Sequence, residues 1–266
     1  GSEMCIRDSI VYHRCGGKSL GYPPNTVLTA EWAAKNGAQA IEYDVAVAKD
    51  ESGFKVFVVE PKLLKAAGLD INNLSWDDVR KIDTGNEKFG PQKIALLEEM
   101  LGAVNSERVA HQIQIKGQHP ATVKEVLARV KGVKNYIITA FDVNVIKEIK
   151  QVNEKTPVGW LIKPKLEPGD EAGVDLTAKL LARADKLENY SDAELSQLIQ
   201  MSKDSAVEIL LLSAPRIKEK GVVEKVRASG LQIGAWGIAT NLALAKQMIG
   251  FGLDRFTIDN PEELHV

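Results

Sequence analysis

The stretch Ala40-Ile41-Glu42-Tyr43-Asp44-Val45 places two carboxylates two residues apart within an apolar, β-branched run. Side chains two apart on a strand share a face, so Glu42 and Asp44 are expected to point the same way. Burial and mutual repulsion oppose the ionisation of such a pair, and a hard divalent cation, Mg²⁺ or Ca²⁺, would offset that cost. The structural alternative is that Asp44 ends the strand and Glu42 pairs with a lysine. These six residues leave both interpretations open.

Length and composition limit what surrounds this pair. The chain has 266 residues, 44% of them hydrophobic, with a formal charge of −2. This length suits one large domain or two small ones, and a single α/β barrel typically needs about 250 residues. Without a long basic run or an apolar run of about 18 residues, neither nucleic-acid binding nor a membrane span is predicted. Oligomeric state cannot be inferred from these features.

The beginning of the chain and its cysteines bear on domain bounds and localisation. Gly1-Ser2 resembles a tag remnant, and residues 1–9 show neither a signal-peptide pattern nor a structural one. We therefore expect a leader over 1–9 and a single domain over 10–266. Two cysteines make no disulfide framework, so a cytoplasmic location is predicted; a periplasmic or secreted one would follow if an export signal had been removed.

A hairpin is predicted directly after the acidic strand. Lys49–Gly53 has turn composition, and Phe54–Val59 is a second β-branched run. Folding about Glu51-Ser52 places Val59 opposite Asp44, and directly opposed residues share a face. Val59 is therefore expected to face the same site as Asp44.

The rest of the chain alternates between strand and helix patterns. Residues 61–95 lack a strong period and are interpreted as an insertion at the mouth of the site. Nine candidate strands with helices between most of them favour a parallel sheet. Eight parallel strands and one hairpin arm would close a TIM (β/α)8-type barrel; an open doubly wound sheet usually carries a Gly-rich phosphate turn after its first strand, which this chain lacks. Lys163–Gly173, rich in Pro, Gly and charge, is expected to be a loop over the site.

Chemistry in such a barrel gathers where the strands end. His13 is then a candidate general acid or base, and Arg14 and Lys116 are candidates for holding phosphate oxygens. Structural alternatives exist for two of these residues. His13 could be a buried histidine whose ring nitrogens are hydrogen-bonded within the core, and Lys116 could be a solvent-exposed lysine at a strand end. Trp236 could be a stacking wall for a substrate or barrel core. Several polar strand ends converging on one mouth favour a site for an anionic substrate.

The chain resembles the glycerophosphodiester phosphodiesterase family along nearly its whole length. The residues that carry the resemblance are His13-Arg14, Pro23-Pro24-Asn25-Thr26, Ile41-Glu42-Tyr43-Asp44-Val45, Val58-Val59-Glu60-Pro61, Ile113-Gln114-Ile115-Lys116, Trp236 and Phe256-Thr257-Ile258-Asp259-Asn260-Pro261. The resemblance implies a TIM barrel with a divalent cation, held by Glu42, Asp44 and the residue at position 114. It also implies two histidines acting as acid and base on a phosphodiester.

Several residues depart from the family pattern. Cys15 stands where the family has Gly, and Pro24 where it has Glu. The second catalytic histidine falls on Val59, with Glu60 in place of its aspartate, and the third metal carboxylate falls on Gln114. One positioned acid or base is worth about 10²–10⁴ in rate, so a weakened enzyme is implied.

Three functions therefore remain open. The first is cleavage of glycerophosphodiesters to sn-glycerol 3-phosphate and an alcohol, with His13, Arg14 and Lys116 as the catalytic residues and Arg14, Lys116 and Trp236 binding substrate. Its divalent cation would be weakly bound or absent. The second is a non-catalytic barrel that binds phosphate esters. The third is a natural or engineered barrel with different chemistry on a flat organic substrate.

Overall fold

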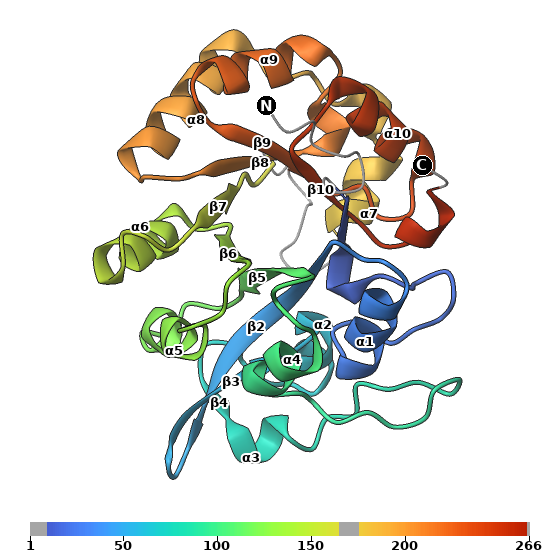
Figure 1. Ribbon diagram of the computed structural model, residues 1–266, viewed down its shortest axis with the longest axis vertical. Helices are drawn as coiled ribbons and strands as arrows, with labels where there is room; N and C mark the ends of the chain where they lie inside the picture. The colour runs from blue at the N-terminus through green and yellow to red at the C-terminus, as the bar shows by residue number, and fades with distance from the viewer. Residues whose placement is uncertain (1–9, 165–175, 265–266) are drawn as a thin grey trace.

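Eight parallel strands form a closed ring in the computed structural model, which describes residues 10–164 and 176–264 (Figure 1). Strand β1 pairs with both β2 and β10 and so closes the barrel. The ring strands are β1 (Ile10–Tyr12), β2 (Ala40–Asp50), β5 (Ala110–Ile115), β6 (Tyr136–Ala140), β7 (Val158–Leu161), β8 (Ile209–Ser213), β9 (Gln232–Trp236) and β10 (Arg255–Ile258). The predicted TIM-type barrel is confirmed.

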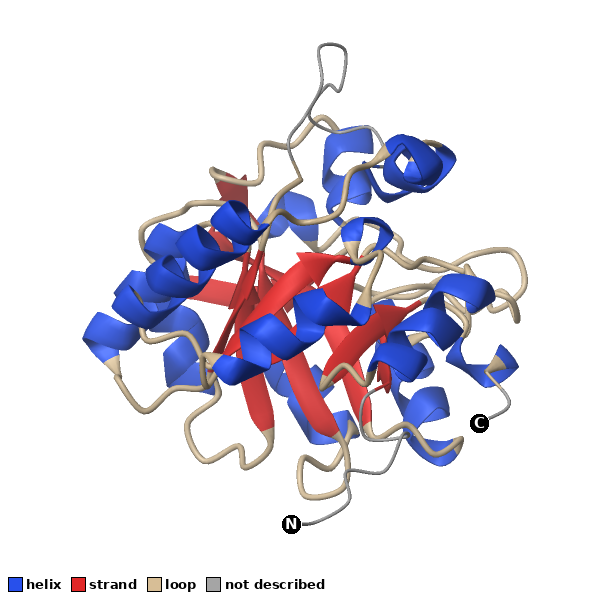
Figure 2. Ribbon diagram, turned by 90° about the horizontal axis from the view of Figure 1, so that it is seen from above, coloured by secondary structure: helices blue, strands red, loops and turns tan. Residues whose placement is uncertain are grey.

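Helices surround the strands, as Figure 2 shows. They are α1 (Val27–Lys35), α4 (Leu97–Ala103), α5 (Thr122–Arg129), α6 (Val143–Val152), α7 (Leu176–Ala182), α8 (Asp192–Asp204), α9 (Lys220–Ala228) and α10 (Leu242–Phe251). All of these helices except α7 pack apolar side chains against the outer faces of the strands, as with Ile146 and Ile149 of α6. In the part of the chain that the structure describes, no helix is both long and apolar enough to cross a membrane.

The predicted hairpin follows β2. Strand β3 (Gly53–Val58) runs antiparallel to β2, and the pairs Val45–Val58 and Asp50–Gly53 fix the turn at Glu51-Ser52. The insertion then contributes α2 (Pro61–Ala66), α3 (Trp76–Val79) and the two-residue strand β4 (Leu74–Ser75). Strand β4 pairs parallel with the far end of β2, and the sequence did not predict it because two residues show no periodicity.

The barrel interior differs from one side to the other. On the side of β6 to β9 it is apolar, with Ile137, Leu161, Ile209, Leu211 and Trp236 in one cluster that Leu180 of α7 completes. Gly234 makes this packing possible, because a Cβ there would lie 2.5 Å from the Leu211 Cδ2 atom. On the side of β1, β2 and β5 the interior is polar near the strand ends.

Helix α9 begins at Lys220, after a separate 3-10 turn over Ala214–Arg216 that contains Pro215. Most of the loop expected over Lys163–Gly173 lies outside the described residues.

Candidate functional site

The chain turns sharply where β1 ends. His13–Cys15 forms a 3-10 turn in which Arg14 has φ of 50° and Cys15 has φ of 72°. A side chain in this left-handed region costs roughly 1–2 kcal/mol, so a glycine would suit position 15 better than the cysteine that this chain has. The turn aims the His13 and Arg14 side chains at the end of β2. Cys15 is fully buried, and burial raises the pKa of its thiol well above the usual value.

Glu42 and Asp44 lie side by side in the barrel interior, each only 1% exposed. One oxygen of Glu42, Oε2, accepts a hydrogen bond from the Arg14 backbone N–H at 2.9 Å and lies 3.9 Å from the Nε2 atom of His13. The acidic pair of β2 and the imidazole at the end of β1 are thus brought together, as the sequence predicted.

Cations surround Asp44. The Lys116 Nζ atom lies 3.1 Å from Asp44 Oδ1, and Arg14 Nε lies 3.7 Å from Asp44 Oδ2. Burial favours protonation of both acids, but these cations outweigh burial at Asp44 and lower its pKa. At Glu42, burial and the neighbouring Asp44 prevail and raise the pKa. The pKa values of the two carboxyl groups are therefore shifted in opposite directions.

Arg14 also contacts Glu60, which follows β3. Its Nη1 atom lies 2.5 Å from Glu60 Oε2. Burial raises the Glu60 pKa even against this guanidinium. Arg14 Nε has no hydrogen-bond partner within the described residues. That nitrogen is buried, and the Asp44 carboxylate lies 3.7 Å from it.

His13 has a second carboxylate partner that the sequence did not assign a role. Its Nδ1 atom makes a very short contact with Asp259, which follows β10, and Lys18 donates to the other Asp259 oxygen at 2.7 Å. Burial and Arg14 act to lower the His13 pKa, yet Glu42 and Asp259 together raise it. Burial acts to raise the Asp259 pKa, but His13 and Lys18 hold it far below its usual range. Nδ1 is thus engaged, and Nε2 remains the nitrogen that faces the acidic pair.

Asn25 is another residue that the sequence analysis left without a role. It accepts a hydrogen bond from the Asp44 backbone N–H at 3.2 Å, and its amide donates to Asp44 Oδ2 at 3.3 Å and to the Val59 carbonyl at 3.2 Å. Its φ of 58° is one that asparagine tolerates better than most residues. The available signal was Pro-Pro-Asn before a helix, because asparagine favours turns of this kind. Thr26 caps α1, because its side chain accepts a hydrogen bond from the Thr29 backbone N–H.

Val59 lies where the hairpin register predicted, with its backbone N–H donating to the Asp44 carbonyl at 3.0 Å. The side chain is fully buried in an apolar cluster that includes Leu64, Leu74 and Val79 of the insertion. No proton-transfer group therefore stands at this position.

Trp236 lies on the apolar side of the mouth. It is 7% exposed, its indole N–H donates to the Ile162 carbonyl at 3.2 Å, and its ring meets Phe141 edge-on at 5.1 Å. Phe141 in turn lies 5.6 Å from Lys116 Nζ. The indole is thus part of the barrel packing, one ring removed from the charged groups, and a role for Trp236 in substrate binding stays a prediction.

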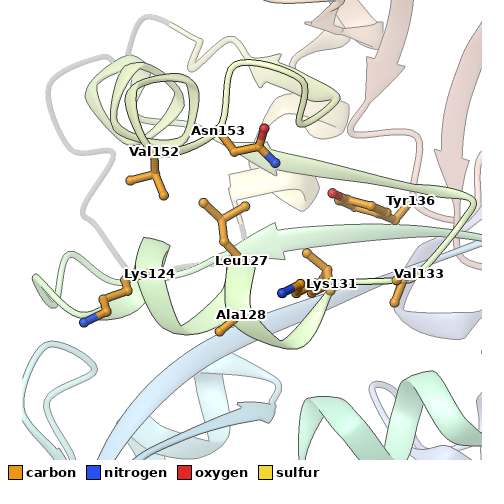
Figure 3. Close-up of a pocket in the computed structure, with 10 residues that line it drawn as sticks. Lys124, Leu127, Ala128, Lys131, Val133, Tyr136, Val152 and Asn153 are labelled. Carbon is orange, nitrogen blue, oxygen red and sulfur yellow. The ribbon is translucent and has the colours of Figure 1, made fainter.

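A surface hollow of about 450 Å³ lies elsewhere, between α5 and α6 (Figure 3). Leu127, Lys131, Tyr136, Val152 and Asn153 are among its lining residues. They lie at or just after the C-terminal ends of α5 and α6 and at the start of β6. The hollow is therefore at the N-terminal end of the barrel strands, opposite the candidate site. In TIM barrels that end serves stability, so the hollow is not part of the candidate site.

Comparison with known families identifies the chain. Residues 13–263 match the glycerophosphoryl diester phosphodiesterase family. The chain belongs to this family. A glycerophosphodiester phosphodiesterase of Caldanaerobacter subterraneus is 25% identical over 170 residues, which span 59% of this chain and 67% of the relative.

Solved structures of this family share the barrel. A phosphodiesterase of Oleispira antarctica, determined with its product sn-glycerol 3-phosphate, superposes with a TM-score of 0.73 at 16% identity, covering 96% of this chain and 94% of that one. A glycerophosphodiester phosphodiesterase of Thermotoga maritima gives a TM-score of 0.67 at 22% identity, with 95% of each chain covered. At these identities the likeness establishes the fold.

Members of the glycerophosphoryl diester phosphodiesterase family generally use a divalent cation. Among the described residues there is no group of three or more His, Cys, Asp or Glu side chains placed to hold a metal ion. Glu42 and Asp44 are the acids of the predicted site, and Gln114 supplies an amide rather than a third carboxylate. Calcium takes six to eight oxygen ligands and favours charged ones. The donor set of this chain does not fit the family's cation well.

Proposed function

We propose that this barrel binds phosphodiesters of glycerol at the strand ends and hydrolyses them slowly to sn-glycerol 3-phosphate and an alcohol. The observation that supports this most is the arrangement of His13, with Nδ1 engaged by Asp259 and Nε2 3.9 Å from Glu42. A histidine fixed through one ring nitrogen presents the other for proton transfer in a defined orientation.

The phosphate would be held by the cations beside Asp44. Arg14 Nε is a buried donor without a hydrogen-bond partner among the described residues, and both it and Lys116 Nζ lie beside the Asp44 carboxylate. Contacts from a guanidinium and an ammonium to phosphate oxygens are strong because both partners are charged. Binding would thus need only a small shift of groups already in place.

The bond that breaks joins phosphorus to the alcohol oxygen. Protonated His13 would donate its Nε2 proton to that oxygen as the alcohol leaves, which its raised pKa favours. A water oxygen forms the new bond to phosphorus and must lose a proton. Val59 cannot accept it, so the proton would pass to bulk water and this half of the reaction would lack a positioned base. Loss of one such group costs about 10²–10⁴ in rate.

Turnover of glycerophosphocholine, followed as release of sn-glycerol 3-phosphate, tests the proposal. We expect slow release by the wild-type chain and at least about tenfold faster release by the double variant Val59→His, Gln114→Glu, assayed with excess Mg²⁺ or Ca²⁺. The matched control is Val59→Asn, Gln114→Glu, which restores the carboxylate and polarity without a group that transfers protons. No release by either the wild-type chain or the histidine variant would contradict the proposal.

A non-catalytic phosphate-ester-binding barrel is the second candidate, and the burial of Val59 among apolar side chains favours it. It predicts that glycerol 3-phosphate raises the melting temperature of the wild-type chain while no glycerophosphodiester is cleaved. An unchanged melting temperature across a panel of phosphate esters would exclude it.

A further inference from the structure

Gln114 joins the two halves of the acidic site. In the orientation that satisfies both ends of its amide, the NH₂ donates to Glu42 Oε1 at 2.9 Å and the carbonyl oxygen accepts from Lys116 Nζ at 2.9 Å. The reverse orientation would point the amide oxygen at a carboxylate and the NH₂ at an ammonium group. The hydrogen-bonding groups therefore fix the Gln114 amide as a bridge between the Glu42 carboxylate and the Lys116 ammonium group.

With that bridge in place, donors meet all four oxygens of the acidic pair. The two oxygens of Glu42 face the Gln114 amide and the Arg14 N–H, at 2.9 Å each. Those of Asp44 face Lys116 Nζ at 3.1 Å and the Asn25 amide at 3.3 Å. A buried carboxylate is costly without such partners, and here the protein supplies them.

A glutamate at position 114 would change this balance. Its carboxylate would stand about one hydrogen-bond length from Glu42 Oε1, where the amide now donates. Two buried carboxylates at that distance demand a proton or a cation between them. The amide removes the demand, and a divalent cation that bound here would have to displace Lys116 from Asp44 and turn the amide away from Glu42.

We infer that Gln114 and Lys116 take the place of the metal in this chain, so that the acidic pair is neutralised from within and the site holds no divalent cation at millimolar concentration. This inference concerns cation binding alone. It is tested without turnover, so its failure is distinguishable from a failure of the proposed hydrolysis.

The experiment is calorimetric titration and thermal melting of the full chain after chelator treatment, with CaCl₂ and MgCl₂ as the probes. The wild-type chain should show no binding heat and no shift in melting temperature at about 1 mM cation. That concentration would occupy even a weak calcium site like those of extracellular proteins, with a Kd of about 0.1–1 mM. The variant Gln114→Glu should melt at a lower temperature in chelator. Saturating cation should then raise its melting temperature by roughly 5 °C or more.

Gln232→Glu is the matched control, because it adds the same charge at an exposed position where β9 begins, at the other end of the barrel. It should behave as the wild type. Wild-type binding of either cation with a Kd below about 1 mM would overturn the inference, as would a Gln114→Glu variant no more responsive than the control.

A second variant covers the case in which Gln114→Glu does not fold. Lys116→Met removes the ammonium group from Asp44 and leaves the Gln114 bridge to Glu42. Its melting temperature should fall in chelator and recover in part with CaCl₂. A fall with no cation-dependent recovery would overturn the inference without reliance on the Gln114→Glu variant.

Discussion

Two strands end beside the acidic pair of β2, and they meet it with different chemistry. Strand β1 ends in His13 and Arg14, whose polar atoms engage Asp259, Glu42 and Glu60. Strand β3 ends at Val59, whose side chain belongs to the apolar cluster of the insertion. The family resemblance implies a histidine at each end. In this chain a histidine and an arginine follow β1, and a valine packed in an apolar cluster follows β3.

This difference shows that a fold can hold one half of a site while the other half changes. The backbone at Val59 still donates to the Asp44 carbonyl, so the hairpin positions Asp44 whatever side chain stands there. Backbone geometry and proton-transfer chemistry at this position are therefore separable, and substitution at each strand end should produce different losses.

The largest effect is expected at the end of β1. His13→Ala should lower phosphodiesterase turnover by about 10²–10⁴, because it removes the proton donor. Asp259→Asn should lower turnover less, since the histidine remains but loses its orienting carboxylate. If Asp259 acts only through His13, the double variant should be no slower than His13→Ala. Additive losses in kcat would contradict that positioning role.

The next effect concerns the cation that neutralises the acidic pair. Lys116→Met should lower the free energy of unfolding by about 3 kcal/mol, because it leaves the buried Asp44 with fewer partners. Lys18→Met is the control: its ammonium pairs with Asp259, but the side chain is 62% exposed, and the loss should stay under about 1 kcal/mol. Urea unfolding at neutral pH measures both. Equal losses of unfolding free energy in the two variants would mean that burial of the partner carboxylate does not determine how far each substitution destabilises the chain.

The smallest effect is expected at the end of β3. Val59→Ala should destabilise the chain by about 2 kcal/mol through lost burial and a residual cavity. Turnover should be unchanged, since the valine transfers no proton. Val152→Ala, on a side chain 57% exposed, should cost less than about 0.5 kcal/mol. A drop in kcat for Val59→Ala, at full folding, would show that the packed end of β3 still shapes the reaction.

Much of the fold could be predicted because its signals are local. The alternation of strand and helix patterns indicates a parallel barrel, and the short turn at Glu51-Ser52 sets the register that brings Val59 to Asp44. The convergence of His13, Glu42, Asp44 and Lys116 followed from the general rule that barrel strands end at one mouth. Their roles in catalysis and in metal binding stay predictions.

The partners that complete the site could not be predicted in the same way. Asp259 meets His13 only because β10 lies beside β1 in the closed ring, and no local pattern in the sequence reports such a pair. Asn25 is placed by a left-handed backbone conformation that the sequence merely permits. The role of Gln114 depends on which end of its amide faces Glu42, and that follows from the neighbouring charges rather than from its position on the strand.

The contact between β1 and β10 also has a consequence for synthesis of the chain. His13 and Asp259 are separated by 246 positions, so the ribosome must make nearly everything between them before the histidine can be oriented. Long-range pairing of this kind forms late, because the chain loses the entropy of loop closure before the contact can stabilise it. In a nascent chain that has emerged only as far as β9, Asp259 is missing and the His13 imidazole has no carboxylate to orient it. We therefore expect phosphodiesterase activity to appear abruptly, once β10 has joined the barrel.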